Sequence, residues 1–330
     1  MRKAKNRILA LALALVMFVS AQFVLGISGA PHIGMPLSVS YREPVDYTAQ
    51  YQGGGAAFKA SETLSFARQK RWINNHAADN EDVKAWLNIQ GTNINYPVVY
   101  NNEQLTGYYL YRDWKGKNYP INYSNWSQYP DTAIILDYRT RIGDSWATSS
   151  RNMVLYGHNW NNLKEPAVIG NQKGYSMFAQ LKSYTNLEFA RENPHIYFSM
   201  GEFEGIWRVF AVGYATTSPN FAYNTPNMTK KQLQYIIDGW RGRSKFDFDV
   251  EVTNNDRILT LSTCTRQHGP NDTQRYVVVA RLLRPGESED DKVSVRVNKD
   301  IIPFTFNPPP PPDFTASAAA EQAPETTPVP

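Results

Sequence analysis

The heptapeptide ILTLSTC at residues 258–264 carries the strongest signal in this sequence. It is rich in residues that favour β-strands, and it breaks directly into the polar stretch TRQHGPNDTQ. The end of a strand that opens into a loop is where a scaffold presents side chains to a substrate. Cys264 is the only cysteine of the chain, and a lone cysteine is more often a small buried apolar residue than a nucleophile. Its neighbours therefore have to decide between these two interpretations.

Similar short segments recur between Gly91 and Leu283. Clusters of Asn, Gly, Pro and Asp separate them, which is the pattern of an all-β barrel or sandwich. The segments are INYPVVY, TAIILDY, NMVLYGH, HIYFSM, WRVFAVGYAT, ILTLSTC and YVVVARLL. The sequence thus predicts a mainly β domain.

A few helices are expected around these strands. Residues 228–240, MTKKQLQYIIDGW, predict a helix inserted before the cysteine strand, with Thr229 as N-cap. Residues 178–184 predict a short helix, and another begins near Ser61, its expected cap. Residues 83–89, VKAWLNI, are interpreted as a short helix that runs into a strand. The apolar face of the inserted helix would hold Leu233, Ile236, Ile237 and Trp240.

The apolar run from Ile8 to Ile27 is long enough to cross a membrane, since about 20 residues at ~1.5 Å each span the ~30 Å hydrocarbon core. Basic residues precede it, which predicts a cytoplasmic N-terminus and a domain on the extracellular face of the cell membrane. A retained single-pass anchor in residues 1–30 is favoured over a cleavable signal peptide, whose apolar core is usually shorter. Residues 31–60, rich in Gly, Pro, Ser and Tyr, are then a flexible spacer.

The domain itself is expected to occupy residues 61–303. Residues 304–330 are rich in proline and have no Lys or Arg after Asn307, so they are predicted to form a disordered tail with polyproline II character. The formal charge of +4 lies entirely in four basic residues among the first seven, which argues against nucleic acid as a partner. No cluster of His, Cys and carboxylate suggests a metal, and no cofactor is expected.

A cysteine nucleophile needs a partner, usually histidine, and a group that stabilises the oxyanion. His158 ends the strand-like MVLYG and opens the polar stretch NWNNLKE, which repeats the setting of Cys264. His268 competes with it, because it lies only four residues after Cys264 in the same loop. Spacing alone leaves both open. The remaining candidates, in less suggestive settings, are His32, His76 and His195.

The motif TLSTC at residues 260–264 resembles the sortase family, in which a TLxTC strand end carries the nucleophile. Sortases also carry a histidine at the end of an earlier strand, matched here by YGH at 156–158, and an arginine that opens the next strand, matched by Arg275. The resemblance extends from about Asp79 to Leu283. The helical insert and the N-terminal helices are similar to those of class B sortases, whereas the proline-rich tail is not associated with that subgroup.

This resemblance implies a sortase-like closed β-barrel and a cysteine transpeptidase of the surface of a Gram-positive bacterium. Cys264 would attack the Thr carbonyl of a sorting motif, NPxTN-like in class B, near the C-terminus of a secreted protein. His158 would protonate the leaving amine, and Arg275 would stabilise the oxyanion or hold the motif, since its guanidinium is a fixed fork of donors. An amine of a peptidoglycan precursor would then accept the protein. We expect substrate contacts from Thr263, Ser262 and Asn159.

Some alternatives stay open at this point. A pilus-polymerising sortase would use a Lys amine of a pilin subunit as acceptor, and a cysteine hydrolase would use a similar Cys and His pair, although papain-like enzymes place their cysteine at a helix start. A catalytically silent module on the same barrel is disfavoured by the three intact residues. Arg281 shares the strand face of Arg275 but lies six residues further on, about 20 Å away. It is expected to tolerate replacement by Lys.

Overall fold

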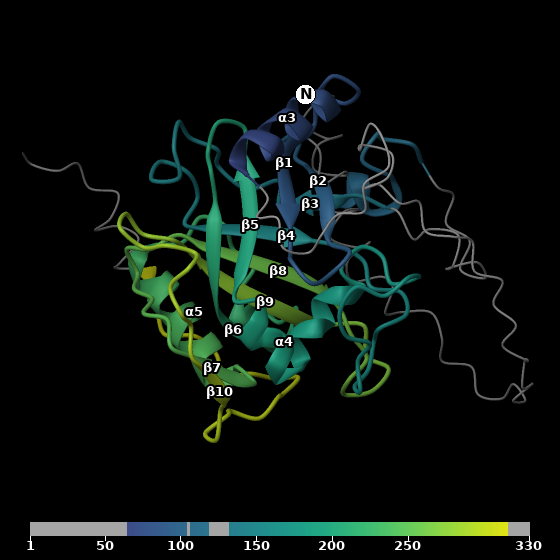
Figure 1. Cartoon of the computed structure of the whole chain (residues 1–330). Coiled ribbons are helices and arrows are strands. Elements are labelled where there is room, and N and C mark those ends of the chain that lie inside the picture. The colour runs from purple at the N-terminus through teal and green to yellow at the C-terminus, as the bar shows by residue number, and fades with distance from the viewer. Residues whose placement is uncertain (1–64, 104–105, 119–131, 316–330) are drawn as a thin grey trace, which may run out of the picture. The chain divides into compact units, whose positions relative to one another are not determined.

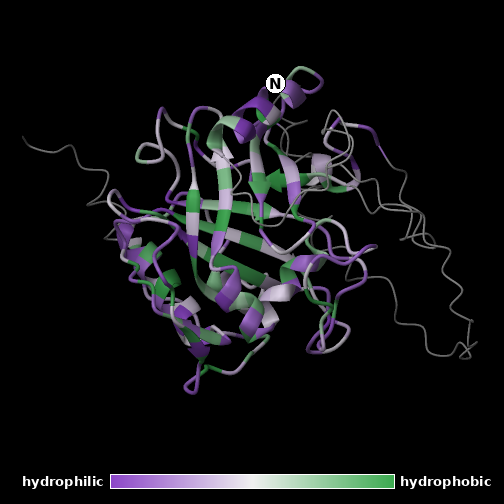
Figure 2. Cartoon of the chain, viewed as in Figure 1, coloured by the Kyte–Doolittle hydropathy of each residue, from purple (hydrophilic) through white to green (hydrophobic). Residues whose placement is uncertain are grey.

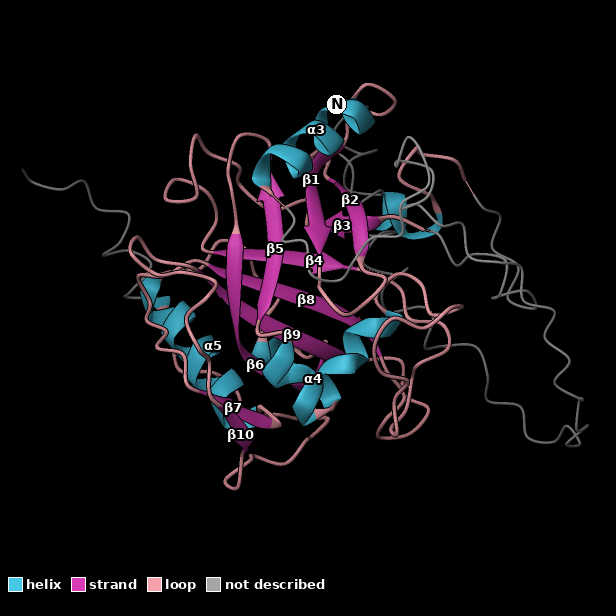
Figure 3. Ribbon diagram, viewed as in Figure 1, coloured by secondary structure: helices cyan, strands magenta, loops and turns pink. Residues whose placement is uncertain are grey.

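The computed structural model describes residues 65–103, 106–118 and 132–315. The predicted anchor at 1–30 and spacer at 31–60 lie outside these ranges. Within the ranges, no helix combines the length and the apolar character needed to span a membrane. The described part of the domain is organised around one barrel, shown in Figures 1 and 3.

Eight of the described strands close into this barrel in the order β1-β2-β3-β4-β8-β9-β6-β5. Neighbouring strands are antiparallel except for two parallel pairs, β2 with β3 and β4 with β8. The closed, mainly β fold expected from the sequence is thereby confirmed. The barrel strands are β1 (Val83–Asn88), β2 (Asn95–Val99), β3 (Ile134–Leu136), β4 (Asn152–Tyr156), β5 (His195–Met200), β6 (Ile206–Thr216), β8 (Ile258–Cys264) and β9 (Gln274–Leu282).

The barrel strands carry the apolar residues of the domain, as Figure 2 shows. Side chains such as Phe198, Trp207, Leu261 and Val278 have no or almost no exposed surface. The Trp207 indole donates a hydrogen bond to the Phe198 carbonyl at 2.9 Å, so this ring is buried without an unsatisfied donor. The core therefore provides a rigid frame for the ends of β4, β8 and β9.

Helix α5 (Lys230–Arg243) is the insert predicted before the cysteine strand, and it packs on β6. Thr229 is its N-cap, as the sequence predicted, and the structure adds a reciprocal capping box with Gln232. The end of α5 comes close to Gly213 of β6, where an added Cβ would lie 2.7 Å from the Arg243 carbonyl oxygen. The apolar face of α5, all buried, consists of Leu233, Ile236, Ile237 and Trp240.

The remaining elements are short. Helix α3 (Phe66–Ala77) is capped by Ser65, and the predicted cap Ser61 lies outside the described residues. The short helix expected at 178–184 is the 3₁₀ helix η4 (Ala179–Thr185). The other short elements are η2 (Thr106–Tyr111), α4 (Leu187–Glu192), η5 (Pro219–Phe221) and the antiparallel pair β7 (Phe246–Phe248) with β10 (Val295–Val297).

One expected helix was wrong. Residues 83–89 were interpreted as helical before a strand, but β1 begins at Val83. Its side chains are buried on both faces apart from Lys84, because the barrel covers one face and the Trp86 side packs against Ile73 and Trp72 of α3. A strand buried on both faces loses the alternation that marks a strand in sequence.

The start of the proline-rich tail contacts the domain, although disorder was predicted from residue 304. Phe304 stacks on His268, with ring centroids 3.9 Å apart, and Asn220 donates a hydrogen bond to the Pro308 carbonyl at 2.9 Å. Composition describes only the surface that a segment itself can bury. It takes no account of aromatic surface that the domain offers to the segment.

Candidate active site

Strands β8 and β9 place Cys264 and Arg275 opposite each other. The antiparallel register pairs the last residue of β8, Cys264, with Arg275 near the start of β9. Both side chains are partly exposed. The loop between them is the polar stretch that begins at Thr265. A thiol and a guanidinium thus lie side by side at one end of the β8–β9 pair. A guanidinium in this position can stabilise negative charge that develops when the sulfur attacks a carbonyl group.

The parallel pair β4–β8 brings His158 to the same end of the barrel. Tyr156 is level with Ser262 in this pair, and His158 and Cys264 each follow two residues further along their chains. The pairing continues past the last ladder residue, since the Thr263 hydroxyl donates to the Gly157 carbonyl at 2.7 Å. The three residues singled out from the sequence are therefore brought together by strand register.

A backbone carbonyl determines the protonation of His158. Nε2 of His158 lies 2.7 Å from the Leu110 carbonyl oxygen, which can only accept, so this nitrogen carries the proton. Burial lowers the pKa of His158 to about 4; the Leu110 hydrogen bond opposes this shift, and the charge of Arg275 adds to it. The ring is thus neutral at pH 7, with Nδ1 as the acceptor. Trp160 stacks on it at a centroid distance of 4.2 Å.

The Arg275 guanidinium is fixed to the loop that it closes. Its Nη1 donates to the carbonyl of Asp272 at 2.6 Å and to that of Gln274 at 2.8 Å. Both bonds use one of the three nitrogens. Among the residues that the structure describes, backbone groups rather than a carboxylate hold this permanent positive charge at the start of β9.

Ser262 and Thr263, expected to contact substrate, are both 2% exposed. The Ser262 hydroxyl lies 3.0 Å from the Tyr223 hydroxyl, and the Thr263 hydroxyl is bonded to Gly157. Both side chains thus make contacts inside the protein next to Cys264. Their expected contacts with substrate stay a prediction.

Asn159, the third residue expected to contact substrate, is bonded to the backbone of the nucleophile Cys264. Its amide nitrogen donates to the Cys264 carbonyl at 3.2 Å and to the Asn162 carbonyl at 2.8 Å, and its amide oxygen accepts from the Asn162 N–H at 2.9 Å. The side chain is 3% exposed. This arrangement links the loop that carries His158 to the residue that carries the thiol.

Further bonds join the loops after His158 and Cys264. The Leu163 carbonyl accepts from the Thr265 hydroxyl at 2.7 Å and from the Arg266 N–H at 2.9 Å. The Glu165 N–H donates to the Gln267 side chain at 2.6 Å. The two loops therefore form one bonded unit, which keeps the relative positions of His158 and Cys264.

Sequence reasoning missed Leu110 and Tyr223. Leu110 acts through its backbone carbonyl, 48 positions before His158, so its side chain carries no signal. Tyr223 is buried near the site; burial, the largest cause, raises the pKa of Tyr223, and the charge of Arg275 opposes this shift. Tyr223 lies in a stretch rich in aromatic residues, so the sequence gave no reason to single out this tyrosine.

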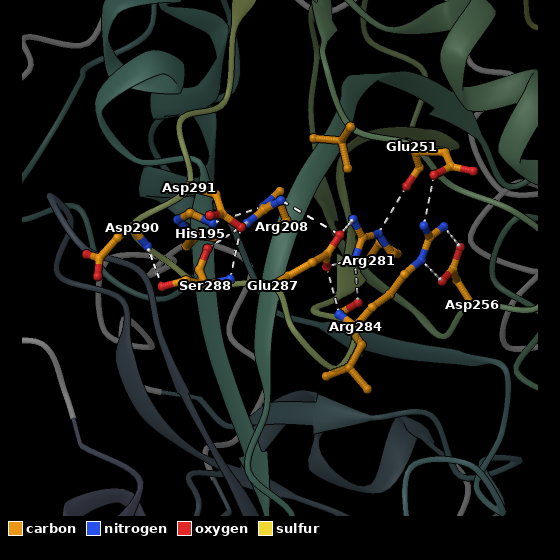
Figure 4. Close-up of polar contacts among 12 residues, drawn as sticks. His195, Arg208, Glu251, Asp256, Arg281, Arg284, Glu287, Ser288, Asp290 and Asp291 are labelled. Atoms are coloured by element: carbon orange, nitrogen blue, oxygen red, sulfur yellow. Dashed lines mark hydrogen bonds and ion pairs between the residues drawn. The ribbon is translucent and has the colours of Figure 1, made fainter.

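Arg281 is buried, and the expectation that it tolerates replacement by Lys stays a prediction. It is 1% exposed, and its guanidinium donates through Nη2 and Nη1 to both carboxylate oxygens of Glu287, at 2.8 Å for the Nη2 bond. Figure 4 shows this pair within a group of charges that includes Arg208 and Arg284. The group lies at the other end of β9 from Arg275, where Arg281 pairs with Ile258. The loop after β9 folds back over this strand end and brings Glu287 to Arg281.

Comparison with known proteins agrees with this geometry. A family profile described as the sortase domain matches residues 87–283. The chain is 27% identical over 205 residues to sortase B of Staphylococcus aureus, covering 62% of this chain and 72% of that protein. It is 28% identical over 208 residues to sortase B of Listeria monocytogenes, covering 63% and 70%.

Solved structures give the same assignment. A complex of Staphylococcus aureus sortase B with substrate superimposes with a TM-score of 0.51 at 25% identity, covering 66% of this chain and 87% of that one. Sortase B of Clostridium perfringens, at 24% identity and a TM-score of 0.51, covers 64% and 99% and supports the fold alone. The chain belongs to the sortase family of cysteine transpeptidases, and the relatives that it matches here are class B sortases.

Proposed function

We propose that this sortase cleaves a C-terminal sorting motif resembling NPxTN in secreted proteins and joins the Thr carboxyl group to an amine of a cell-wall precursor. The observation that carries the proposal is the strand pairing that sets Cys264 opposite Arg275 and brings His158 to the same end of the barrel. The relatives that this chain matches are class B sortases, and the structure of one of them was solved in complex with substrate.

The first half of the reaction follows from the protonation state of His158. Neutral His158, protonated at Nε2, takes the thiol proton of Cys264 at Nδ1. The thiolate attacks the Thr carbonyl carbon, and the negative charge that develops on the carbonyl oxygen is stabilised by Arg275. The C–N bond then breaks, and His158 returns the proton to the leaving amine. A thioester on Cys264 remains.

The second half repeats these steps with another amine. The acceptor amine attacks the thioester carbon, Arg275 again faces the oxyanion, and His158 takes the proton that the amine loses. The C–S bond breaks, and His158 returns this proton to the departing Cys264 sulfur, which restores the thiol and the neutral imidazole. We place this reaction at the outer face of the cell membrane, with residues 1–30 as a single-pass anchor, because the secreted substrate and the precursor amine meet there.

Product analysis tests the proposal. The purified domain is incubated with a peptide that contains an NPxTN-like motif and with a short glycine peptide as amine. Mass spectrometry should detect a product that ends in Thr joined to the added amine, and none with Cys264→Ala. Cleavage outside the motif, or hydrolysis that added amine never diverts, would contradict transpeptidation on this motif.

A further inference from the structure

Residues 302–314, here called the C-terminal strap, connect two segments that flank the candidate site. The strap starts at the end of α5, where the Ile302 N–H donates to the Gly242 carbonyl at 2.7 Å. Phe304 stacks face to face on His268, with centroids 3.9 Å apart and an interplanar angle of 4°, and Phe306 packs edge-on against Phe304 at 5.0 Å. The first of these two segments is therefore the loop between β8 and β9.

The loop between β8 and β9 follows Cys264 and leads to Gln274 and Arg275 at the start of β9. His268 is held within this loop, because its backbone N–H donates to the side-chain oxygen of Gln274 at 2.7 Å. The Gln274 amide in turn donates to the Gly269 carbonyl at 2.8 Å. Gln274 is the neighbour of Arg275, so a contact that holds His268 also restrains the residue before Arg275.

The second segment is the connection between β6 and α5. Asn220 in η5 donates to the Pro308 carbonyl at 2.9 Å, and Phe314 packs edge-on against Tyr235 at 5.7 Å. The Tyr235 hydroxyl donates to the Asn220 carbonyl at 3.4 Å, so both strap contacts meet at η5. Three residues after Asn220 comes Tyr223, whose hydroxyl is bonded to Ser262.

The composition of the strap suits this role. Residues 308–312 are consecutive prolines, which fix φ and reduce the entropy lost when the segment is held against the domain. Polyproline II backbone has no internal hydrogen bonds, so its carbonyls are available to a side chain such as that of Asn220. Pro308, the residue that accepts this bond, is buried.

From these contacts we propose that the C-terminal strap positions the active site for catalysis, with Phe304 and His268 as its positioning residues. The strap holds the β8–β9 loop and the β6–α5 connection together, and thereby keeps Cys264, Arg275 and Tyr223 in their relative places. The catalytic part of this proposal rests on the proposed function. The effect of the strap on the two segments can be measured without turnover. Each of the two segments has its own contact with the strap. The β8–β9 loop is held by the stack of Phe304 on His268, and the β6–α5 connection is held by the hydrogen bond from Asn220 to Pro308.

Two truncations and a set of point variants test the strap. A chain that ends after residue 303 loses Phe304 and everything beyond it, and a chain that ends after residue 315 is the matched control that keeps the strap. Phe304→Ala removes the stack, Phe304→Tyr keeps an aromatic ring, and Val297→Ala changes a residue that is 55% exposed in β10. Hydrogen exchange of residues 265–274 and 218–224 and the kcat and KM for a sorting peptide are measured for each.

The truncation after 303 and Phe304→Ala should speed exchange in residues 265–274, and the truncation also in 218–224. KM should rise by roughly 3- to 10-fold, the range that one aromatic contact corresponds to, with a smaller change in kcat. Phe304→Tyr, Val297→Ala and the truncation after 315 should match the wild type. The double variant of Phe304→Ala with His268→Ala should be no worse than the more affected single variant, because both remove the same contact.

If hydrogen exchange of residues 265–274 and 218–224 is unchanged in the chain that ends after residue 303, the proposal that the strap holds these segments is overturned. This result does not depend on whether the enzyme turns over a peptide. Faster exchange with unchanged kcat and KM would overturn its positioning role and leave only a structural contact. If the wild type cleaves no sorting peptide, the proposed function fails, and the exchange measurements still decide whether the strap holds the two segments.

Discussion

Cys264 and Arg275 are direct partners in the antiparallel register of β8 and β9, although a loop separates them along the chain. This pairing makes the position of the guanidinium a property of the barrel rather than of the loop. The loop adds two bonds from Nη1 to backbone carbonyls, which hold the side chain without neutralising its charge. The chemistry proposed for this strand end depends on that charge and on the planar fork that carries it.

Replacement of Arg275 by Lys should therefore affect turnover rather than folding. The ammonium keeps the charge but cannot reproduce the fork of donors, so kcat/KM for a sorting peptide should fall by roughly 10²-fold or more. The melting temperature should change little, because the side chain is partly exposed. Steady-state kinetics and thermal melts of the same preparation decide the matter. Retained turnover would show that Arg275 does not face the oxyanion.

His158→Ala should be nearly as damaging as loss of the nucleophile, because it removes the neutral imidazole whose Nδ1 is available to take the thiol proton. His268→Ala is the matched control: it removes the other histidine near the site and should weaken turnover only by the few-fold effect expected for loss of the Phe304 stack. Kinetics with one peptide compare the two. The opposite order would identify His268 as the proton-transfer partner.

The described residues show which parts of this molecule are legible in sequence. The α5 insert was predicted with its N-cap because Thr229 precedes a segment whose apolar residues repeat at helical spacing. The positions of Cys264, His158 and Arg275 were legible because each ends or opens a strand-like run. Strand ends are local features, and the barrel register then brings them together.

Other features depend on the tertiary structure. β1 lost its alternation because α3 covers the face that would otherwise be exposed. The proton on His158 is located by the Leu110 carbonyl, and a backbone atom leaves no trace in side-chain composition. The contacts of Phe304 needed the aromatic surface of His268, which composition of the tail alone does not include.

Arg281 should be required for stability and not for chemistry. Arg281→Met removes a buried guanidinium and leaves the Glu287 carboxylate, which is 24% exposed, without its bidentate donor, which should cost about 1.5–3 kcal/mol of unfolding free energy. Denaturant unfolding measures this cost. Arg296→Met is the control, because the Arg296 side chain is 78% exposed and its pair with Asp247 should contribute about 0–1 kcal/mol. Equal effects of the two variants would contradict the buried pair.

Stability should fall in mild acid because of His195. Burial, followed by the charge of Arg208, lowers the pKa of His195 to about 4, with Asp291 and Asp290 acting in the opposite direction. Its Nε2 also accepts from the Arg208 Nε–H at 3.2 Å, which requires the neutral ring. Between pH 6.5 and 4 the unfolded chain binds a proton that the folded chain does not, so the free energy of unfolding decreases as the pH falls through this window.

The contribution of His195 is isolated by comparing the wild type with His195→Gln in denaturant unfolding at pH 7.5 and pH 5. The wild type should lose more stability on acidification than the variant, since Gln does not titrate. The other histidines titrate in both proteins and cancel in the comparison. Identical losses would mean that His195 is not held neutral by its surroundings.

The most direct test of the account is the covalent state of Cys264 during turnover. The domain is mixed with an NPxTN-like peptide without added amine, quenched in acid, digested and analysed by mass spectrometry. We predict a thioester on the peptide that contains Cys264, with the mass of the substrate fragment ending in Thr, and its disappearance when a glycine peptide is added before the quench. Cleavage without this adduct, or cleavage retained by folded Cys264→Ala, would contradict the central claim that Cys264 is the nucleophile.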